Sequence, residues 1–329
     1  RQNTAYGMVI RDLTANVCSS DLAGDSFFVA TRSDGTAMLI VTPADSTIQN
    51  QLMWLFGLES QPGFQFVARE VEPDESAEMD FAARYVLDEI GIELEEPEAG
   101  RLDALIEPFG FAFPTTKVLS DLARKSLPGA LPLDAPDEAI LAWMELEEQL
   151  FRRLERRIVD SRLRSGFIAD AGSDVDGFLS FSLSVQNRRK SRAGHALENH
   201  LEALFRAHGI RFSRGAETEN RNKPDFLFPG QAEYRDPLFP ADRLTMLGAK
   251  STLKDRWRQV LSEAERFDAK HLLTLEPGVS TNQTDEMRTK RLQLVVPAGL
   301  QKTYTEAQRA WLMDVASFVR LVASKESST

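Results

Sequence analysis

Lys250 lies where a buried strand is expected to run into a basic helix, within the stretch MLGAKSTLKDRWRQ of residues 246–259. A lysine at such a junction is typical of metal-dependent nucleases, which usually carry a carboxylate two residues before it. Here that position is Gly248, although a divalent cation needs hard anionic oxygen ligands. The spacing therefore predicts either an inactive site or an acid supplied from elsewhere in the chain.

Asp225 opens the apolar strand Phe226-Leu227-Phe228, and a second buried strand follows and ends in Lys250. Two neighbouring strands of this kind could hold the carboxylate and the ammonium side by side at the edge of a sheet. The alternative is that Asp225 caps a turn and that Lys250 is the solvated end of a strand. These two residues alone do not separate the two interpretations.

Glu263 offers the missing acid. A helix is expected over residues 255–267, because apolar side chains recur there at helical spacing; they are Trp257, Val260, Leu261, Ala264 and Phe267. Glu263 shares an adjoining face with Arg256 and Gln259. A carboxylate on that face could reach the strand end, and Mg²⁺ requires oxygen ligands whatever their place in the sequence.

Glu198 is a further carboxylate candidate, on a helix whose buried stripe is expected to contain Leu197, Leu201, Leu204 and Phe205. Glu198 lies at the margin of this stripe. An acid there is either solvated or turned toward a site, and Glu198 taken alone favours the solvated interpretation.

Composition limits the class of protein. The 329 residues are enough for two domains with separate cores, and 42% apolar with 27% charged residues is ordinary for a soluble protein. No apolar run approaches the roughly 18 residues of a membrane span, and no signal peptide opens the chain. A single cysteine, Cys18, excludes an internal disulfide and a Cys-rich zinc site. A cytoplasmic protein without a membrane partner is expected.

Residues 1–22 have two interpretations. The stretch Val17-Cys18-Ser19-Ser20-Asp21-Leu22 matches the translation of a sequencing-adapter oligonucleotide, and the chain lacks a starting methionine. A non-native segment and a Ser-rich N-terminal loop are equally good accounts.

Charge is divided unequally along the chain. Residues 1–150 carry 9 Lys and Arg against 27 Asp and Glu, a net −18, whereas residues 151–329 carry 30 against 23, a net +7. The overall charge of −11 would argue against a nucleic-acid partner. The basic second half removes that objection.

Residues 23–130 are expected to form a smaller, acidic α+β domain. Strands over residues 27–30 and 37–42 surround an Asp34-Gly35 turn and predict a hairpin. A third strand and two helices are expected over residues 64–71, 77–90 and 117–125. Because its acidity would repel phosphates, this domain is expected to regulate or to contact a protein.

Residues 137–329 are expected to form a second domain. The segment 127–136 contains three prolines and predicts a linker, after which Asp137 could cap a helix to about residue 164. Apolar strands then alternate with amphipathic helices, which predicts a central sheet covered on both faces. The expected strands cover residues 210–212, 225–228, 244–250, 271–275 and 292–296, and a closing helix covers residues 305–322.

Several ordered motifs within residues 140–325 together resemble the catalytic domain of the EcoRII family of type II restriction endonucleases, of which PspGI is a smaller member. They are NRRKSRAG at 187–194, LE at 197–198, KPDFLFP at 223–229, AK at 249–250, KDRWRQ at 254–259 and LVVP at 294–297. Their density and order make chance a poor explanation.

The resemblance implies the PD-(D/E)XK nuclease fold, an α/β fold with a central mixed sheet flanked by helices, in the variant whose second acid lies on the following helix. Gly248 is then tolerated because Glu263 replaces the missing acid. The positions that match the family's active site are Asp225, Lys250 and Glu263, with Glu198 as an auxiliary acid and Tyr234 and Lys254 as two further members.

The chemistry expected from this set is hydrolysis of a phosphodiester with Mg²⁺ as cofactor. Asp225 and Glu263 would hold the metal, which lowers the pKa of bound water and offsets developing charge. Lys250 would orient or deprotonate that water. Tyr234 and Lys254 would hold neighbouring phosphates.

Two basic clusters flank these residues and are candidates for reading double-stranded DNA. They are Arg188, Arg189, Lys190 and Arg192, and Arg256 with Arg258. A guanidinium can bind guanine bidentately in the major groove; the alternative for each cluster is a phosphate contact without sequence information. By resemblance, the target is a short palindrome of CC and GG around an A·T pair, cut by a homodimer, with a cognate DNA methyltransferase in the same system.

Two other functions are compatible with the same fold. One is a DNA-binding regulator that has lost its activity, and the other is a DNA-repair nuclease. The intact set of Asp225, Lys250 and Glu263 favours an active enzyme over the regulator.

Overall fold

The computed structural model describes residues 6–12, 25–31, 35–58, 66–71, 80–92, 99–169, 172–253, 256–264, 266–267 and 269–327. Contacts between residues group the chain into two units. Unit 1 contains Arg1–Leu94, Glu276–Thr289 and Leu300–Trp311, and unit 2 contains Glu95–Leu275, Lys290–Gly299 and Leu312–Thr329. The contacts thus divide the chain elsewhere than at the Pro-rich segment 127–136.

Five strands form the sheet of unit 2, in the order β11-β10-β9-β8-β7. Three are parallel, namely β9 (Thr245–Lys250), β10 (Lys270–Thr274) and β11 (Leu292–Val295). The antiparallel strands are β8 (Phe226–Phe228) and β7 (Ser213–Arg214). The sheet is therefore mixed, as expected, and the strand expected at 210–212 lies slightly later in the chain.

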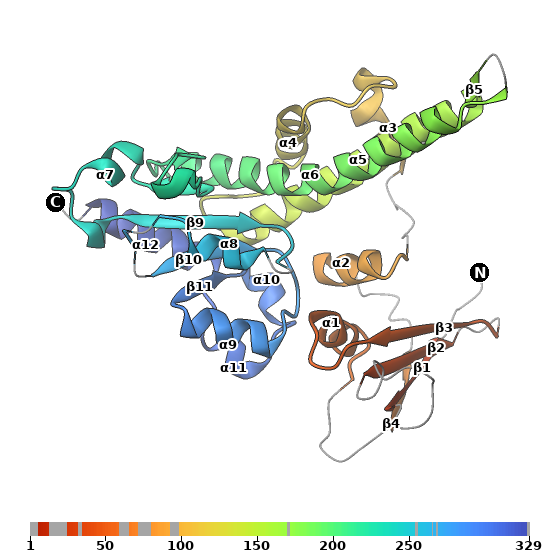
Figure 1. Cartoon of the computed structure of the whole chain (residues 1–329), viewed down its shortest axis with the longest axis horizontal. Coiled ribbons are helices and arrows are strands. Elements are labelled where there is room, and N and C mark those ends of the chain that lie inside the picture. Colours follow the sequence, from red (N-terminus) through yellow and green to blue (C-terminus); the bar gives the residue numbers. More distant parts are fainter. Residues whose placement is uncertain are drawn as a thin grey trace. The chain divides into compact units, whose positions relative to one another are not determined.

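Two long helices, α5 (Pro136–Ser165) and α6 (Val175–Ala207), run side by side as a hairpin in unit 2 (Figure 1). A short ribbon of β5 (Ile168–Ala169) and β6 (Gly172–Ser173) connects them. The helices α3 (Ala99–Ile106) and α4 (Thr116–Lys125) pack on α5, and η1 (Glu107–Phe109) lies between them in the chain. Their apolar side chains share one core cluster with α5, which explains why residues 99–125 belong to unit 2.

Asp137 does not cap the helix that it was expected to start. Pro136 occupies the first turn of α5, where its missing N–H is not needed. The Asp137 carboxylate instead accepts the backbone N–H groups of Ala298, Val315 and Ala316 at 2.9, 2.8 and 3.0 Å. It therefore caps α12 (Val315–Ser327) and the start of α10 (Ala298–Gln301).

An aromatic cluster fixes β8 between helices of unit 2. The ring of Phe205 on α6 meets Phe226 and Phe228 edge to face, with centroids 5.3 and 5.1 Å apart, and Phe228 meets Phe318 of α12 at 5.7 Å. Such pairs add to the free energy gained from burial alone. The strand that follows Asp225 is thereby held firmly.

Short elements surround the strand ends of unit 2. They are η2 (Glu219–Arg221), α7 (Gln231–Arg235), η3 (Ala241–Arg243) and α8 (Trp257–Leu261). The helix expected over residues 255–267 is thus shorter than the apolar spacing suggested. Trp257, Val260 and Ala264 are nevertheless fully buried, as the spacing predicted.

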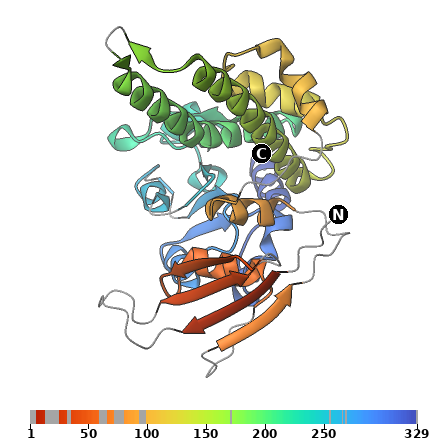
Figure 2. The ribbon, with the colours of Figure 1, turned by 90° about the vertical axis from the view of Figure 1, so that its right-hand side faces the viewer.

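Unit 1 contains a four-stranded antiparallel sheet in the order β3-β2-β1-β4 (Figure 2). Its strands are β1 (Tyr6–Asp12), β2 (Ser26–Thr31), β3 (Ala37–Thr42) and β4 (Phe66–Val71). The pairing of Thr31 with Ala37 confirms the expected hairpin. Two helices, α1 (Thr47–Leu55) and α2 (Phe81–Glu89), complete a core around Phe28, Leu52 and Val86.

The later segments of unit 1 are hydrogen-bonded to α1. Gln51 donates its side-chain N–H to the carbonyl of Pro277 at 2.9 Å, and the Thr47 hydroxyl contacts Gln283 at 3.0 Å. Gln283 belongs to α9 (Thr281–Thr289), and the short helix α11 (Glu306–Arg309) follows in the same unit. The closing helix expected over residues 305–322 is accordingly two helices, α11 and α12.

Among the helices that the structure describes, none is both long enough and apolar enough to cross a membrane.

Candidate active site

Asp225 and Lys250 form an ion pair at the ends of β8 and β9. Nζ of Lys250 lies 2.8 Å from Oδ2 of Asp225, and the backbone N–H of Ala249 donates to the same oxygen at 2.6 Å. The pair arises because Phe226 is opposite Leu247 in the antiparallel register, which brings the two strand ends together. Both side chains are largely buried, with 14% of Asp225 and 19% of Lys250 exposed.

Glu263 lies close enough to this pair to interact with both charges. Burial raises the pKa of Glu263 from 4.5 to about 7; the Lys250 ammonium lowers it, Asp225 raises it, and Lys270 lowers it. Its Oε2 atom is buried and has no hydrogen-bond partner among the described residues. The structure therefore brings together Asp225, Lys250 and Glu263, as the sequence predicted.

Gly248 is required by the packing of α8 on the sheet. A Cβ atom at this position would lie 2.9 and 3.3 Å from the two methyl carbons of Val260 and 3.4 Å from Leu272. Any side chain at residue 248 would push α8 away. This close contact explains why residue 248 carries no acid, while Glu263, three residues after Val260, lies near Asp225 and Lys250.

The backbone around Glu263 is unusual. Ser262 caps the C-terminus of α8, and Ala264 has φ of +50° although it carries a side chain. The left-handed conformation costs a non-glycine residue about 1–2 kcal/mol. Because Ala264 is fully buried, the surrounding packing must hold this turn in place.

The site supplies few carboxylates for a metal. No cluster of three or more His, Cys, Asp and Glu side chains that could hold an ion occurs in the described part of the chain. Mg²⁺ commonly retains several waters and binds through one or two carboxylates. Asp225 and the unpartnered Oε2 of Glu263 fit that mode of binding.

Glu198 is engaged elsewhere in this structure. Its Oε2 accepts two hydrogen bonds from Arg214 of β7, at 2.7 and 3.1 Å, and Arg214 also binds Glu202 at 2.9 Å. None of these bonds involves Asp225 or Glu263. The expected auxiliary acid is therefore neutralised by an arginine that the sequence did not single out.

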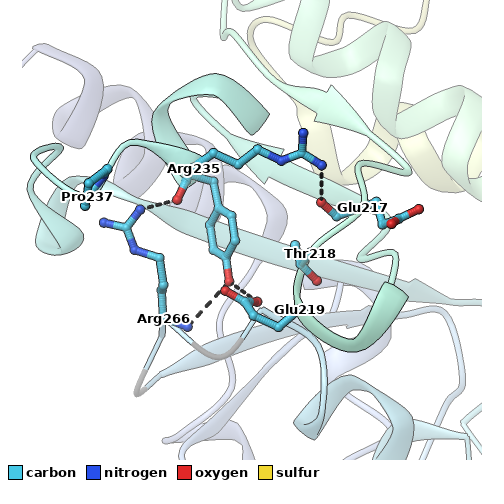
Figure 3. A pocket seen from close by; sticks show the side chains of 7 residues that line it. Glu217, Thr218, Glu219, Arg235, Pro237 and Arg266 are labelled. Carbon is cyan, nitrogen blue, oxygen red and sulfur yellow. Dashed lines mark hydrogen bonds between the residues drawn. The ribbon is translucent and has the colours of Figure 1, made fainter.

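Tyr234 lines a pocket of about 470 Å³ together with Glu219, Arg266 and four neighbours (Figure 3). Its hydroxyl donates to Oε2 of Glu219 at 2.5 Å, and the guanidinium of Arg266 binds the Tyr234 carbonyl. Burial, followed by the hydrogen bond with Glu219, raises the pKa of Tyr234 above its usual value. Both the hydroxyl and the carbonyl of Tyr234 are therefore hydrogen-bonded within this pocket. Lys254, the other residue expected to hold a phosphate, lies outside the described residues.

The first basic cluster divides into exposed and buried side chains. Arg188 is exposed and stacks over the ring of Phe113 at 4.5 Å, and Lys190 is exposed. Arg189 donates to Glu155 of α5 at 2.6 Å while half of its side chain stays exposed. These three side chains remain candidates for contacting DNA.

Arg192 has a different environment. Only 5% of its side chain is exposed, and it pairs with Glu147 at 3.6 Å and also with Glu148. A guanidinium in that position ties α6 to α5 and does not reach a base edge. Arg192 is therefore not among the DNA contacts proposed below.

The second basic cluster lies at the start of α8. Arg256 donates to the hydroxyl of Thr252 at 2.9 Å and is exposed. Arg258 is also exposed and lies over the ring of Trp257 at 4.7 Å. Arg258 lies in the helix that precedes Glu263, and Arg256 is the N-cap residue of that helix.

Sequence reasoning missed Asn222 and Lys270, which bind the backbone just before Glu263. Asn222 lies three residues before Asp225, and Lys270 opens a buried strand. A lysine at the start of a buried strand is only a weak indication of a structural role. Its partner here is a backbone carbonyl, which cannot be recognised from the residue type.

Comparisons with known proteins show which family and which enzymes the chain is similar to. The family model described as EcoRII C terminal matches residues 151–319. The type II restriction enzyme EcoRII of Escherichia coli is 42% identical over 231 residues, which are 70% of this chain and 55% of EcoRII. The type II restriction enzyme SsoII of Shigella sonnei is 29% identical over 205 residues, 55% of this chain and 65% of SsoII. The chain thus spans about half to two thirds of the length of these relatives.

Solved structures show the same fold. The PspGI complex with substrate DNA matches with a TM-score of 0.53 and 14% identity over 66% of this chain and 95% of PspGI. Metal-depleted Ecl18kI with uncleaved DNA matches with a TM-score of 0.51 and 19% identity over 69% of this chain and 84% of Ecl18kI. The expected restriction-endonuclease fold is confirmed.

Proposed function

The chain belongs to the family of EcoRII C-terminal domains, and we propose that it is a type II site-specific deoxyribonuclease that hydrolyses double-stranded DNA with Mg²⁺. The observation that carries this proposal is the meeting of Asp225, Lys250 and Glu263 at the end of the sheet. An ion pair with a second, half-buried carboxylate beside it is a candidate catalytic constellation.

The three side chains divide the work of phosphodiester hydrolysis. Asp225 and Glu263 would hold Mg²⁺, which lowers the pKa of coordinated water and offsets charge on the phosphate. The ion pair with Asp225 keeps the Lys250 ammonium beside these carboxylates. From there Lys250 would orient the attacking water and stabilise the developing negative charge.

Three further side chains have supporting roles in the proposal. Tyr234 and Lys254 would hold phosphates next to the one attacked, for which Tyr234 must exchange its bond with Glu219. Glu198, as auxiliary acid, must first release Arg214. Glu202, which already binds Arg214, offers that arginine a second carboxylate.

Arg188, Arg189, Lys190, Arg256 and Arg258 are the proposed contacts to DNA. Their exposure to solvent supports this role, since side chains on the surface are accessible to the guanine O6 and N7 atoms of a bound duplex. The proposed target is a short palindrome with CC and GG around an A·T pair. A homodimer would cut it, each subunit acting on one strand, and a cognate methyltransferase would protect the same site.

Residues 1–98, the part of the chain before α3, are proposed to regulate the nuclease or to contact another protein. Their acidity supports this, because they carry 5 Lys and Arg against 18 Asp and Glu, a net −13. A segment of that charge repels phosphates and suits a basic partner.

Digestion of plasmid DNA with Mg²⁺, followed by sequencing of the ends, tests the function. Fragments that all end in one short sequence, made by the wild type and not by Asp225→Asn, are expected. Specific DNA binding without any cleavage would instead indicate a regulator. Cleavage at ends without a common sequence would indicate a repair nuclease.

A further inference from the structure

Glu263 lacks the support that a strand gives to a side chain. Asp225 and Lys250 adjoin paired strands, whereas Glu263 follows the five-residue helix α8 and precedes the left-handed Ala264. A functional side chain must stay within roughly 0.5 Å of its productive position. Groups that hold the end of α8 therefore decide how well Glu263 is placed.

The last carbonyl groups of α8 are bound by side chains of two other elements. Nδ2 of Asn222 donates to the carbonyl of Ser262 at 2.7 Å, and Nζ of Lys270 donates to the carbonyl of Leu261. Helix ends leave such carbonyls without partners inside the helix. The two bonds lie one and two residues before Glu263.

Asn222 is itself fixed in the loop that leads to Asp225. Its backbone N–H donates to the carbonyl of Glu219 at 3.1 Å, and its carbonyl accepts the N–H of Thr218 at 2.8 Å. Asp225 follows only three residues later. The side-chain bond of Asn222 therefore ties the loop before one carboxylate to the turn before the other, Glu263.

Lys270 ties the same turn to the sheet. It begins β10, which pairs with the strand that carries Lys250, and only 8% of it is exposed. A buried ammonium needs strong acceptors, and a helix C-terminus offers carbonyls with partial negative charge. The bond to Leu261 therefore holds both the ammonium and the end of α8.

We propose that Asn222 and Lys270 are positioning residues for a divalent-cation site formed by Asp225 and Glu263, an inference that rests on the function proposed above. Neither side chain contacts the cation. Asn222 sets the spacing between the two carboxylates, and Lys270 fixes Glu263 relative to the sheet. Groups that hydrogen-bond directly to metal-ligating side chains change metal affinity or activity by about 10- to 100-fold when they are replaced, and we expect an effect toward the lower end of that range for bonds to the backbone before a ligand.

The test compares substitutions of Asn222 in the full chain. Asn222→Ala removes the donor, and Asn222→Asp keeps the size but places an acceptor against the Ser262 carbonyl. Asn282→Asp, at an exposed position of α9, adds the same charge elsewhere. Lys270→Met removes the other bond to the end of α8, the one from the sheet. If this variant does not fold, the Asn222 variants alone decide the test.

Two readouts separate positioning from general stability. The first is the Mn²⁺ concentration that gives half of the metal-induced rise in Tm without DNA, since a cation that binds the folded state raises Tm. The second is the Mg²⁺ dependence of plasmid cleavage. Both midpoints are expected to rise about 10-fold or more in Asn222→Asp, and to stay at the wild-type value in Asn282→Asp.

Equal Mn²⁺ midpoints for Asn222→Asp and the wild type, with plasmid cleavage by both, would overturn this inference and leave the proposed function intact. If the wild type shows neither a Mn²⁺ response nor cleavage, the proposed function fails and the positioning roles fail with it.

Discussion

A Cβ atom at Gly248 would lie 2.9 Å from the nearest methyl carbon of Val260, closer than real contacts of this kind. The strand position that usually carries the second acid therefore has no room for any side chain. In the function proposed above, Glu263, three residues after Val260, supplies the second carboxylate. The contact between Gly248 and Val260 explains why that acid is not on the strand.

Gly248→Ala should lower the free energy of unfolding by about 1–3 kcal/mol, because it overpacks the contact between β9 and α8. The double variant Gly248→Ala with Val260→Ala should lose less than the sum of the two single changes, since Val260→Ala makes room for the new methyl group. Urea unfolding of the four proteins measures this. Simple additivity would contradict the close contact.

Glu263 should make the metal-free protein less stable as the pH rises. Burial raises its pKa from 4.5 to about 7 in the folded state, so the folded protein binds more protons than the unfolded chain between these values, and stability falls across that window. Glu263→Gln should remove this fall and be more stable above pH 7, by at most about 3–4 kcal/mol.

Unfolding by urea at pH 5 and pH 8 measures this effect. The wild type should lose stability relative to Glu263→Gln between the two pH values, and added Mg²⁺ should reduce the loss by favouring the carboxylate. Parallel pH profiles for the two proteins would show that Glu263 is not buried as described.

Arg258→Ala should weaken specific DNA binding by about 1–3 kcal/mol and relax the preference for G·C pairs, if this exposed arginine reads base edges. Arg192→Ala should instead destabilise the fold by about 3–5 kcal/mol, because it removes the charged partner of the buried Glu147 and leaves that carboxylate with His200 alone. Binding to specific and random DNA, with Tm for each variant, distinguishes the two. Equal losses on both DNAs would reduce Arg258 to a phosphate contact.

A chain that begins at Ala99 loses the net −13 of residues 1–98, and it also loses the contacts of α1 with residues 276–289. Because only the charge effect is screened by salt, the ratio of its cleavage rate to that of the full chain should be higher at low salt than at high salt. A ratio that does not change with salt would show that the acidic residues do not oppose DNA binding.

A chain that begins at Asp134 should unfold at a lower temperature than the Ala99 chain, since it also loses the buried side chains of α3 and α4. Tm values of the two chains test this.

The proximity of Asp225, Lys250 and Glu263 could be predicted from the sequence because each residue has a strong local signal. Apolar strands flank Asp225 and Lys250, and the helical spacing of Trp257, Val260 and Ala264 places Glu263 on one side of a packed segment. The prediction of which side chains are buried is correct even though the helix ends at Leu261, because Ala264 is still buried after the turn.

Other features could not be predicted because they depend on long-range partners. In sequence, Arg192 looks like the exposed Arg188, Arg189 and Lys190. In the structure it is buried, because it pairs with the buried Glu147 on α5, and it is therefore not accessible to DNA. Asp137 was expected to cap its own helix and instead caps one about 180 residues later. Asn222 and Lys270 donate to backbone carbonyls. Every residue has such a carbonyl, so the amino-acid sequence does not indicate which one accepts the bond.

The most direct test of the account is plasmid cleavage by Glu263→Gln with saturating Mg²⁺, beside Lys250→Ala and the wild type. Because these side chains serve the reaction more than DNA affinity, both variants are predicted to bind the specific site nearly as tightly as the wild type and to lose cleavage. Near-normal cutting by Glu263→Gln would contradict the assignment of Glu263 as the second acid of the metal site. Another residue would then have to supply that acid, with Glu198 as the first candidate.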